Sequence, residues 1–391
     1  SAPLPELGSG VLGAGDATLS GTRTDVPHLA PRGGAYTGGP DWSEATLGYF
    51  ALPARYRAAQ IETVALADVE RLADAIVDWA DGGGADVPPA AHPIDWGRTV
   101  EALPHAEPAR TLADLVAAYG VSGHEGPVRD AVVARLPDWA EPRVDERGNL
   151  LIEFGEGEEH VAFVAHLDEV GFVVETVLDD GRLELSRRGG LSPSLWEAQS
   201  ALVHTAGGAV PGVFEPRDDW FETEVRRPPG ALTVYLGTAS RQATLDLGVA
   251  EGDSVTMPKE MLRLGEHRAV ARGFDDRVGS TAQLLALARI DPATVDRRVT
   301  FAWVVEEEVG LFGSVAMSRD MPDIDRVHAV DTFVSSDDPY PDKGFALTPL
   351  GEGLVMRAMD NVYLADRATI DYVTDLAASR GIPTQIGFTG G

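Results

Sequence analysis

The stretch Phe301–Gly313 reads FAWVVEEEVGLFG, an apolar run of strand length that ends in three carboxylates and a glycine-bearing turn. A continuous apolar run with β-branched and aromatic members predicts a strand covered on both faces, as in a sheet flanked by helices. The chemistry of such sheets gathers beyond the carboxyl ends of the strands. Taken alone, the stretch also fits a solvated acidic loop that follows a core strand. Other segments of the chain must decide between these two interpretations.

Two further apolar runs end in side chains that can bind metals or move protons. Val161–Ala165 is followed by His166 and Asp168, and Val327–Val330 is followed by Asp331. Strand ends of one sheet lie close together, so these groups are expected to converge. Imidazole and carboxylate ligands from separate segments suit zinc, cobalt or manganese. The pattern therefore favours a divalent metal site over a solvated loop.

A fourth acidic segment, Gly273–Gly279 (GFDDRVG), places Asp275 just before a helix predicted over 277–289. The chain contains no cysteine, which excludes disulfides and thiolate metal ligands. Any metal must therefore be held by His, Asp and Glu side chains.

Length and charge restrict the class of protein. The chain has 391 residues, 44% of them hydrophobic and 24% charged, which is typical of a globular protein with two structural units. The net charge of −30, with Lys259 and Lys343 as the only lysines, argues against nucleic acid or anionic membrane as a partner. No apolar span reaches membrane length, so we expect a soluble, cytoplasmic protein. Because the chain begins at Ser1 and stops at Gly391, we also expect a fragment or a processed chain.

Periodicity divides the chain into four parts. Residues 1–50 show no sustained period, whereas the apolar residues of Val69–Val77 follow the period of a helix. Glycine and proline residues from 82 to 108 then indicate a linker. The predicted parts are an N-terminal segment and linker at 1–110, a first catalytic part at 111–177, an inserted β domain at 178–267 and a second catalytic part at 268–391.

The fold class follows from these parts. Short alternating segments between Gly and Pro residues fill 178–267 and predict a small β-barrel or sandwich, while strand and helix patterns alternate on both sides of it. Thr111 is read as the cap of one helix, and Ser122 with Glu125 as the capping box of the next. The predicted class is α/β, a mixed central sheet flanked by helices with an inserted barrel or sandwich domain.

Four motifs together resemble a known family. They are Ala165–Gly171 (AHLDEVG), Gly273–Gly279 (GFDDRVG), Glu307–Gly313 (EEVGLFG) and Val330–Asp331. Their order and spacing are similar to those of the tetrahedral (TET) glutamyl-aminopeptidase family, dinuclear metallopeptidases related to the leucyl aminopeptidases of bacteria. The resemblance covers about Thr111 to Gly391 and implies a zinc-peptidase-like fold.

The resemblance also implies roles for the site residues. His166 and Asp331 would bind one metal ion, Asp275 would bridge two ions, and Glu308 would bind the second. The implied cofactor is two divalent ions, zinc in the first place and otherwise cobalt or manganese.

Two neighbouring carboxylates receive supporting roles from the same resemblance. Asp168 would hold the imidazole of His166, and Glu307 would be the general base. Glu306, one position earlier, is expected to point to the other face of the strand and not to be catalytic. A cis peptide bond is expected between Asp275 and Asp276.

The chain departs from the family pattern in one ligand. The family completes its second metal with a histidine after a Gly-Gly-Thr-Asp stretch, whereas this chain stops at Gly390–Gly391. The N-terminal segment resembles the missing part, with Ala58 where that histidine would stand, and is interpreted as the tail of a degenerate preceding copy or a permuted part of the domain. Residues 45–80 are therefore expected to pack on the catalytic sheet, and the second metal is expected to bind more weakly than the first.

Three functions remain open from the sequence. The leading one is a metallo-aminopeptidase that removes N-terminal residues of peptides with a two-metal activated water and Glu307 as base. A related two-metal deacylase or carboxypeptidase is the second, and a catalytically impaired assembly or binding homologue is the third. Peptide substrates and a homo-oligomer are the expected partners.

Overall fold

The computed structural model describes residues 46–55, 62–80, 103–217, 232–337, 347–360 and 363–389. The predictions made for residues 1–45 and 81–102, for Ala58 and for Gly390–Gly391 fall outside the described residues. No helix in the described ranges is long and apolar enough to cross a membrane.

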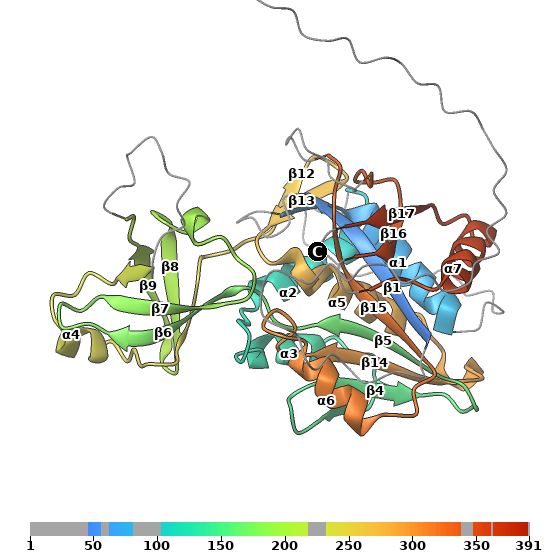
Figure 1. The fold of residues 1–391 in the computed structure, drawn as a ribbon, viewed down its shortest axis with the longest axis horizontal. Helices are drawn as coiled ribbons and strands as arrows, with labels where there is room; N and C mark the ends of the chain where they lie inside the picture. The colour runs from blue at the N-terminus through green and yellow to red at the C-terminus, as the bar shows by residue number, and fades with distance from the viewer. Residues whose placement is uncertain are drawn as a thin grey trace, which may run out of the picture. The chain divides into compact units, whose positions relative to one another are not determined.

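A mixed sheet of 11 strands organises the structure (Figure 1). In spatial order its path runs through β12 (Leu262–Leu264), β13 (Arg268–Ala271), β2 (Glu62–Ala65), β1 (Thr46–Arg55), β15 (Arg326–Val334), β5 (His160–His166), β14 (Arg298–Val304), β4 (Leu150–Phe154) and β3 (Pro142–Val144). β1, β15, β5 and β14 are parallel neighbours, and the other pairs along this path are antiparallel. Off this path, β16 (Leu354–Met359) pairs with β1 and β17 (Thr384–Phe388) pairs with β16. The predicted mixed central sheet is confirmed.

Helices cover both faces of this sheet. Alternate residues of β5 point to opposite faces, and all seven are buried. On one face, Val161 and Phe163 join an apolar cluster built with α1 (Leu66–Ala80), α2 (Ala106–Ala117) and α5 (Phe274–Leu287). On the other, Ala162 and Val164 pack in a cluster with Met317 of α6 (Phe312–Asp320). Burial on both faces explains why the strand sequence is continuously apolar.

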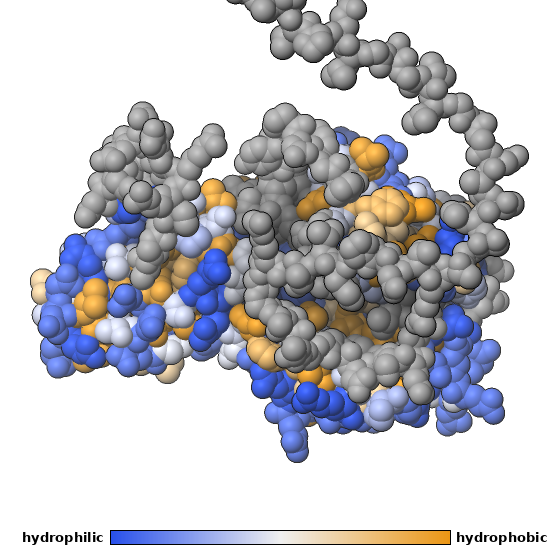
Figure 2. Space-filling model, viewed as in Figure 1, coloured by the Kyte–Doolittle hydropathy of each residue, from blue (hydrophilic) through white to orange (hydrophobic). Residues whose placement is uncertain are grey.

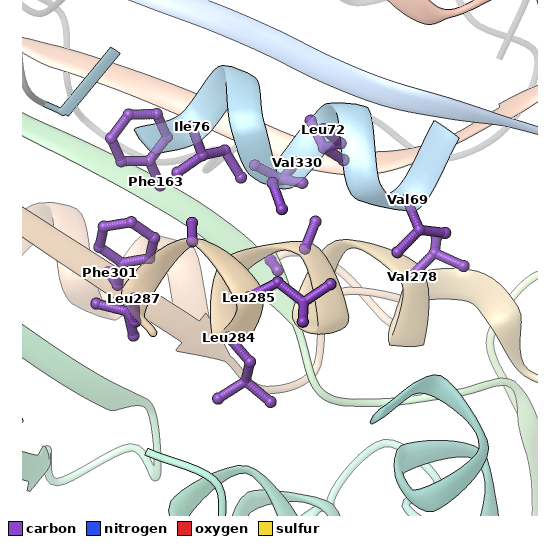
Figure 3. Packing of buried hydrophobic residues seen from close by; sticks show 14 of the residues in the cluster. Val69, Leu72, Ile76, Phe163, Val278, Leu284, Leu285, Leu287, Phe301 and Val330 are labelled. Carbon is purple, nitrogen blue, oxygen red and sulfur yellow. The ribbon is translucent and has the colours of Figure 1, made fainter. Parts of the chain in front are cut away.

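The helix α1 completes the core from the N-terminal side. Figure 3 shows α1 lying alongside α5, with Val69 of α1 facing Val278 of α5. Leu72 of α1 belongs to the same apolar cluster. The apolar positions of α1 recur at the helical period, so one face of the helix is buried along its length. The predicted amphipathic helix is confirmed.

The strand β1 places the N-terminal segment inside the catalytic sheet. Its residues 46–54 pair in parallel with residues 326–334 of β15. The expectation that residues 45–80 pack on this sheet is confirmed for the described residues. It also corrects the length of the predicted strand 327–331, because β15 continues to Val334 alongside β1 and Asp331 lies within the strand instead of at its end.

The inserted β domain is a closed barrel. Its strands are β6 (Gly171–Val177), β7 (Leu183–Arg188), β8 (Ser200–Thr205), β9 (Gly208–Phe214), β10 (Thr233–Tyr235) and β11 (Ser254–Thr256), with the short helix α4 (Arg241–Leu245). The rings of Phe172, Trp196 and Phe214 meet edge to face or tilted in its core. The barrel strands thus span 171–256, where the sequence had placed the insertion at 178–267. β12 and β13 pair with the large sheet because β2, far away in sequence, offers them an edge.

Two predicted helix starts are wrong. α2 begins at Ala106, so Thr111 lies inside it; Pro108 is tolerated because it stands in the first turn, where its missing N–H is not needed. α3 (Gly126–Val133) follows Glu125 without any side-chain cap, so the expected capping box does not form. α7 (Arg367–Ser379), in contrast, has a side-chain cap, because Asp366 accepts a hydrogen bond from Thr369 N.

The charged side chains lie mostly at the surface. On the face shown in Figure 2, hydrophilic residues prevail among the coloured atoms, with apolar patches between them. Few acidic residues of the described part are buried: Asp68, Glu125, Asp168, Glu169, Glu197, Asp276 and Asp331. Most of these belong to one region of the molecule, at the end of the parallel strands.

Candidate metal centre

Three neighbouring parallel strands deliver side chains to the same edge of the sheet. His166 is the last residue of β5, and Asp331 lies level with it inside β15, two residues beyond the pair formed by Ala329 and Val164. β14 ends at Val304, and the loop beyond it carries Glu307 and Glu308. Parallel strands end at a common edge, which is why segments far apart in sequence meet here.

The start of α5 adds the fifth group. Gly273 takes the left-handed conformation at φ 78° and turns the chain into Asp275, which is joined to Asp276 by the expected cis peptide bond. Asp276 was not singled out from the sequence, yet it is fully buried. Its Oδ1 accepts a hydrogen bond from Gly279 N at 2.9 Å, and its Oδ2 accepts one from His166 N at 3.3 Å.

The other four side chains gather around the imidazole of His166. His166 Nε2 lies 3.1 Å from Asp275 Oδ1, 3.9 Å from Asp331 Oδ1 and 3.9 Å from Glu307 Oε2. Two sets have ligand atoms within 4.8 Å of one another: His166 with Asp275 and Asp331, and His166 with Glu307 and Glu308. The structure thus brings together every residue that the sequence proposed as a metal ligand.

This donor set suits a divalent ion. Ligand atoms of a tetrahedral zinc ion with bonds of about 2.0–2.1 Å stand about 3.3 Å apart, close to the separations around His166 Nε2. One imidazole and several carboxylates form the hard-to-intermediate set that zinc, cobalt and manganese accept. The residues present therefore fit the implied ions.

Electrostatics gives a second reason to expect cations here. Burial raises the pKa of Glu307 to about 7; His166 opposes this shift, while Asp331 adds to it. Burial, followed by the charge of Asp275, raises the pKa of Glu308 well above its usual value. Crowded, partly buried carboxylates repel one another, and bound divalent ions would remove that repulsion.

Asp168 lies under the cluster and organises it. The Nδ1 atom of His166 is 3.0 Å from the carbonyl oxygen of Asp168 and 3.4 Å from its Oδ1. Ser122 Oγ donates to Asp168 Oδ2 at 2.6 Å, and the backbone N–H groups of Glu307 and Glu308 donate to its two oxygens at 2.9 and 3.1 Å. Burial would raise the pKa of Asp168, but the hydrogen bonds, led by that with His166, lower it overall. Asp168 therefore remains a carboxylate that fixes both the imidazole and the Glu307 loop.

Ser122 is a site residue that the sequence assigned wrongly. It was read as a helix cap, but its hydroxyl is committed to Asp168. Its supposed partner Glu125 accepts from Gly123 N at 2.8 Å and from Glu306 N at 3.1 Å. Burial raises the pKa of Glu125 to about 6, although the Gly123 N–H opposes the shift. A three-residue spacing cannot reveal these contacts, because their partners come from distant segments.

Glu306 differs from its two neighbours. It lies beyond the end of β14 in a turn with φ 54°, not on the strand where the sequence had placed it. Its carboxylate contacts the guanidinium of Arg147 and takes no part in either set of converging ligands. The expectation that it points away from the site agrees with this geometry.

A cavity of about 430 Å³ adjoins the cluster. It is lined by Ser122, Gly123, His124, Val173, Arg188, Gly252, Glu306, Val309 and Phe312. The residue after Arg188 is Gly189, where an added Cβ would lie 3.4 Å from Glu308 Oε2. The guanidinium of Arg188 forms no ion pair or hydrogen bond within the described part of the chain, although the backbone of Arg188 pairs with Gly171. The cavity therefore contains a guanidinium that has no ionic partner among the described residues.

Comparison with known proteins agrees with this geometry. A lysyl aminopeptidase of Pyrococcus furiosus is 29% identical over 283 residues, which cover 70% of this chain and 79% of that protein. A glutamyl aminopeptidase of Lactococcus lactis is 26% identical over 284 residues, covering 70% of this chain and 78% of the relative.

Solved structures of aminopeptidases share the fold. The TET1 peptidase of Pyrococcus horikoshii, which can assemble into a tetrahedron or a large octahedral shell, is 29% identical with a TM-score of 0.64, covering 73% of this chain and 85% of that one. An aminopeptidase from Desulfurococcus kamchatkensis is 26% identical with a TM-score of 0.66, covering 73% and 80%.

The match to a family model is the most direct finding. The model described as M42 glutamyl aminopeptidase matches residues 148–391, which include the barrel and all five converging side chains. The resemblance seen in the sequence motifs is thereby confirmed. The chain belongs to the M42 glutamyl aminopeptidase family of metal-dependent hydrolases that act on peptide bonds.

Proposed function

We propose that this chain is an aminopeptidase that holds two divalent ions, with zinc preferred over cobalt or manganese, and uses Glu307 as its general base. The observation that supports this most is that His166 shares two groups of ligand atoms within 4.8 Å of one another, one with Asp275 and Asp331 and one with Glu307 and Glu308. In this proposal His166 and Asp331 would hold the first ion, Glu308 would hold the second, and Asp275 would contribute to both. Membership of an aminopeptidase family supports a peptide as the substrate.

The chemistry needs an activated water and a proton carrier. Bound divalent ions supply Lewis acidity, which polarises the scissile carbonyl and makes water acidic enough to ionise near neutral pH. Glu307 takes the proton of the attacking water and delivers it to the leaving amine, because it adjoins the ligands without being needed as one. Asp168 orients the His166 imidazole and, through the backbone of Glu307, the base itself.

The proposal is tested with matched peptides and added metal. Peptides with a free N-terminus should be hydrolysed from that end with zinc, cobalt or manganese, and a chelator should stop the reaction. Hydrolysis of N-acylated substrates alone would favour a deacylase. Absence of any hydrolysis despite bound metal would favour a binding homologue. We also propose that the protein works as a homo-oligomer, since its structural neighbours include a dodecamer and a tetrahedral shell.

The two ions should bind with unequal strength. Among the described residues, the first ion would have the imidazole of His166 and the carboxylates of Asp275 and Asp331. In the proposed assignment the second ion would have only the carboxylates of Asp275 and Glu308, which lie close enough for the charge of Asp275 to raise the pKa of Glu308. Fewer protein ligands give weaker binding, so zinc titration by calorimetry should resolve a tight site and a weaker one. Two ions of equal affinity in each chain would contradict this assignment of ligands.

Arg188 gives the cavity a preference by charge. The relatives include both a glutamyl and a lysyl aminopeptidase, so their names alone do not indicate which charge the substrate carries. The guanidinium of Arg188 in the cavity attracts a carboxylate and repels an ammonium group. We therefore propose that the cavity receives the side chain of an acidic N-terminal residue.

This preference predicts the effect of Arg188→Gln. The substitution should lower kcat/KM for glutamyl p-nitroanilide by a factor of about 10 to 100, the usual worth of a hydrogen bond to a charged group. The leucyl substrate should be unaffected and serves as the control. An equal loss for both substrates would show that Arg188 supports the site without selecting substrates.

A further inference from the structure

Glu169 is a buried carboxylate that the proposed reaction does not use. It follows Asp168 directly and is 1% exposed. Its Oε1 lies 2.6 Å from Lys259 Nζ and 3.6 Å from a terminal nitrogen of Arg277, and its Oε2 lies 2.7 Å from Arg272. One carboxylate therefore faces three cations, all buried with it.

Each of the three cations ties Glu169 to a different part of the fold. Lys259, just beyond the barrel, donates to the carbonyl of Ala118 at 3.0 Å and lies over the ring of Tyr119. Arg272, at the approach to α5, lies over the ring of Trp196 in the barrel. The cluster thus joins the barrel, the loop after α2 and the start of α5.

Arg277 connects the cluster to the metal centre. It stands two positions after Asp275, and it donates to the carbonyl of Leu167 at 2.7 Å and to that of Leu115 at 3.2 Å. Leu167 is the residue between His166 and Asp168. Arg277 therefore holds the α5 segment against the strand end that carries the imidazole, with Glu169 facing its guanidinium.

Glu169 also fixes the loop that carries Ser122. Gly120 N donates to Glu169 Oε1 at 3.1 Å, and Glu169 N donates to the carbonyl of Gly120 at 2.8 Å. Two residues later, Ser122 holds Asp168. The Glu169 carboxylate thus contacts both the Gly120 loop and Arg277, which lie on either side of the segment that carries His166.

The charge balance makes this carboxylate hard to replace. Buried ions are stable only when they are paired and hydrogen-bonded, and three cations of like sign would otherwise repel one another. Burial would raise the pKa of Glu169, but the cations, led by Arg272, lower it well below its usual value. Burial lowers the pKa of Lys259 to about 7, although Glu169 opposes that shift. The geometry and the charges agree on an ionised Glu169.

We propose that Glu169 is a positioning residue that sets the separation of His166 and Asp275 by holding Arg277 and the Gly120 loop in place. Through Lys259 and Arg272 it also couples this separation to the seating of the barrel. The inference rests on the proposed function for its catalytic meaning, but its effect on metal binding does not depend on turnover.

Glu169→Gln tests the proposal because it keeps the shape and removes the charge. We expect zinc affinity to fall about 10-fold, in the range found for groups that orient metal ligands, and kcat to fall more than KM rises. The visible spectrum of the cobalt-loaded protein, which reports ligand geometry, should change as well. Glu197→Gln is the matched control, because Glu197 is equally buried and pairs with Arg217 at 2.9 Å within the barrel region.

A double variant keeps the test decisive if Glu169→Gln folds poorly. Adding Lys259→Met removes one of the uncompensated cations while keeping the apolar stem over Tyr119, so Glu169→Gln/Lys259→Met should recover part of the lost stability and zinc affinity. Unchanged zinc affinity and cobalt spectrum in the folded single or double variant would overturn the proposal, as would an equal change in Glu197→Gln. A wild-type protein that binds zinc normally but hydrolyses no peptide would overturn the proposed function alone.

Discussion

Glu307→Gln should lower kcat by about two to four decades, the usual contribution of a positioned general base. The amide cannot accept the proton of the attacking water, yet it has nearly the size of the carboxylate it replaces. Metal content should therefore stay at the wild-type level. Zinc analysis together with steady-state kinetics on one peptide substrate measures both quantities.

The pH profile provides an independent view of the same residue. A base acts in its deprotonated form, so activity should fall as the pH drops through the pKa of Glu307. That pKa is raised to about 7, mainly by burial, in the protein alone, and bound cations would lower it. The acidic limb of the kcat profile should accordingly lie below pH 7 in the wild type.

The neighbouring carboxylate is a strict control for this prediction. Glu306→Gln changes the same type of residue one position away. Glu306 contacts Arg147 and lines the cavity, but it takes no part in the converging sets, so the substitution can change KM without removing a group that acts in the chemical step. Its kcat should remain within a few-fold of wild type. If Glu307→Gln and Glu306→Gln lost activity equally, or if Glu307→Gln lost its zinc, the assignment of the base would be wrong.

His166→Ala should abolish both tight metal binding and peptide hydrolysis. His166 is the one residue shared by the two sets of converging ligands, and its Nε2 is the only imidazole nitrogen in either. Without it the remaining carboxylates repel one another around an incomplete site. Zinc titration should show the tight site missing, and activity should fall to the background of the assay.

A second histidine variant separates this effect from a general loss of stability. His267→Ala removes an exposed imidazole that belongs to neither ligand set. It should retain wild-type zinc affinity and turnover. Full zinc binding by a folded His166→Ala protein would refute the metal assignment for the whole cluster.

The sequence predicted those site residues that follow directly after the carboxyl end of a buried strand. Buried strands carry continuous apolar residues and end where polarity returns, so the positions of His166 and of the Glu307 loop could be read from the text alone. The ligand set was obtained from motif order, and it converges in the structure. Asp331 was placed correctly in space but wrongly as a strand end, because the length of β15 is set by its distant neighbour β1.

The residues that sequence reasoning missed act through distant contacts. Ser122 has a spacing that suits a helix cap, but tertiary structure gives its hydroxyl to Asp168. Glu169 follows a strand end like any acidic loop residue, and its three cationic partners are separated from it by about a hundred positions. A local sequence pattern reports only the preferences of neighbouring residues, so it cannot reveal contacts between segments that are far apart in sequence.

The pairing of β1 with β15 has a consequence for how the chain reaches its native state. The parallel pairing of residues 46–54 cannot form until residues 326–334 have been synthesised. In the same way, the apolar face of α1 cannot be covered by α5 until that helix has been synthesised. The barrel, by contrast, is built from a contiguous stretch and can form while synthesis continues. Contacts so remote in sequence slow folding, because the entropy cost of closing a long loop comes before the favourable energy of the contacts. During translation the N-terminal strand and helix are therefore made long before the partners that cover them.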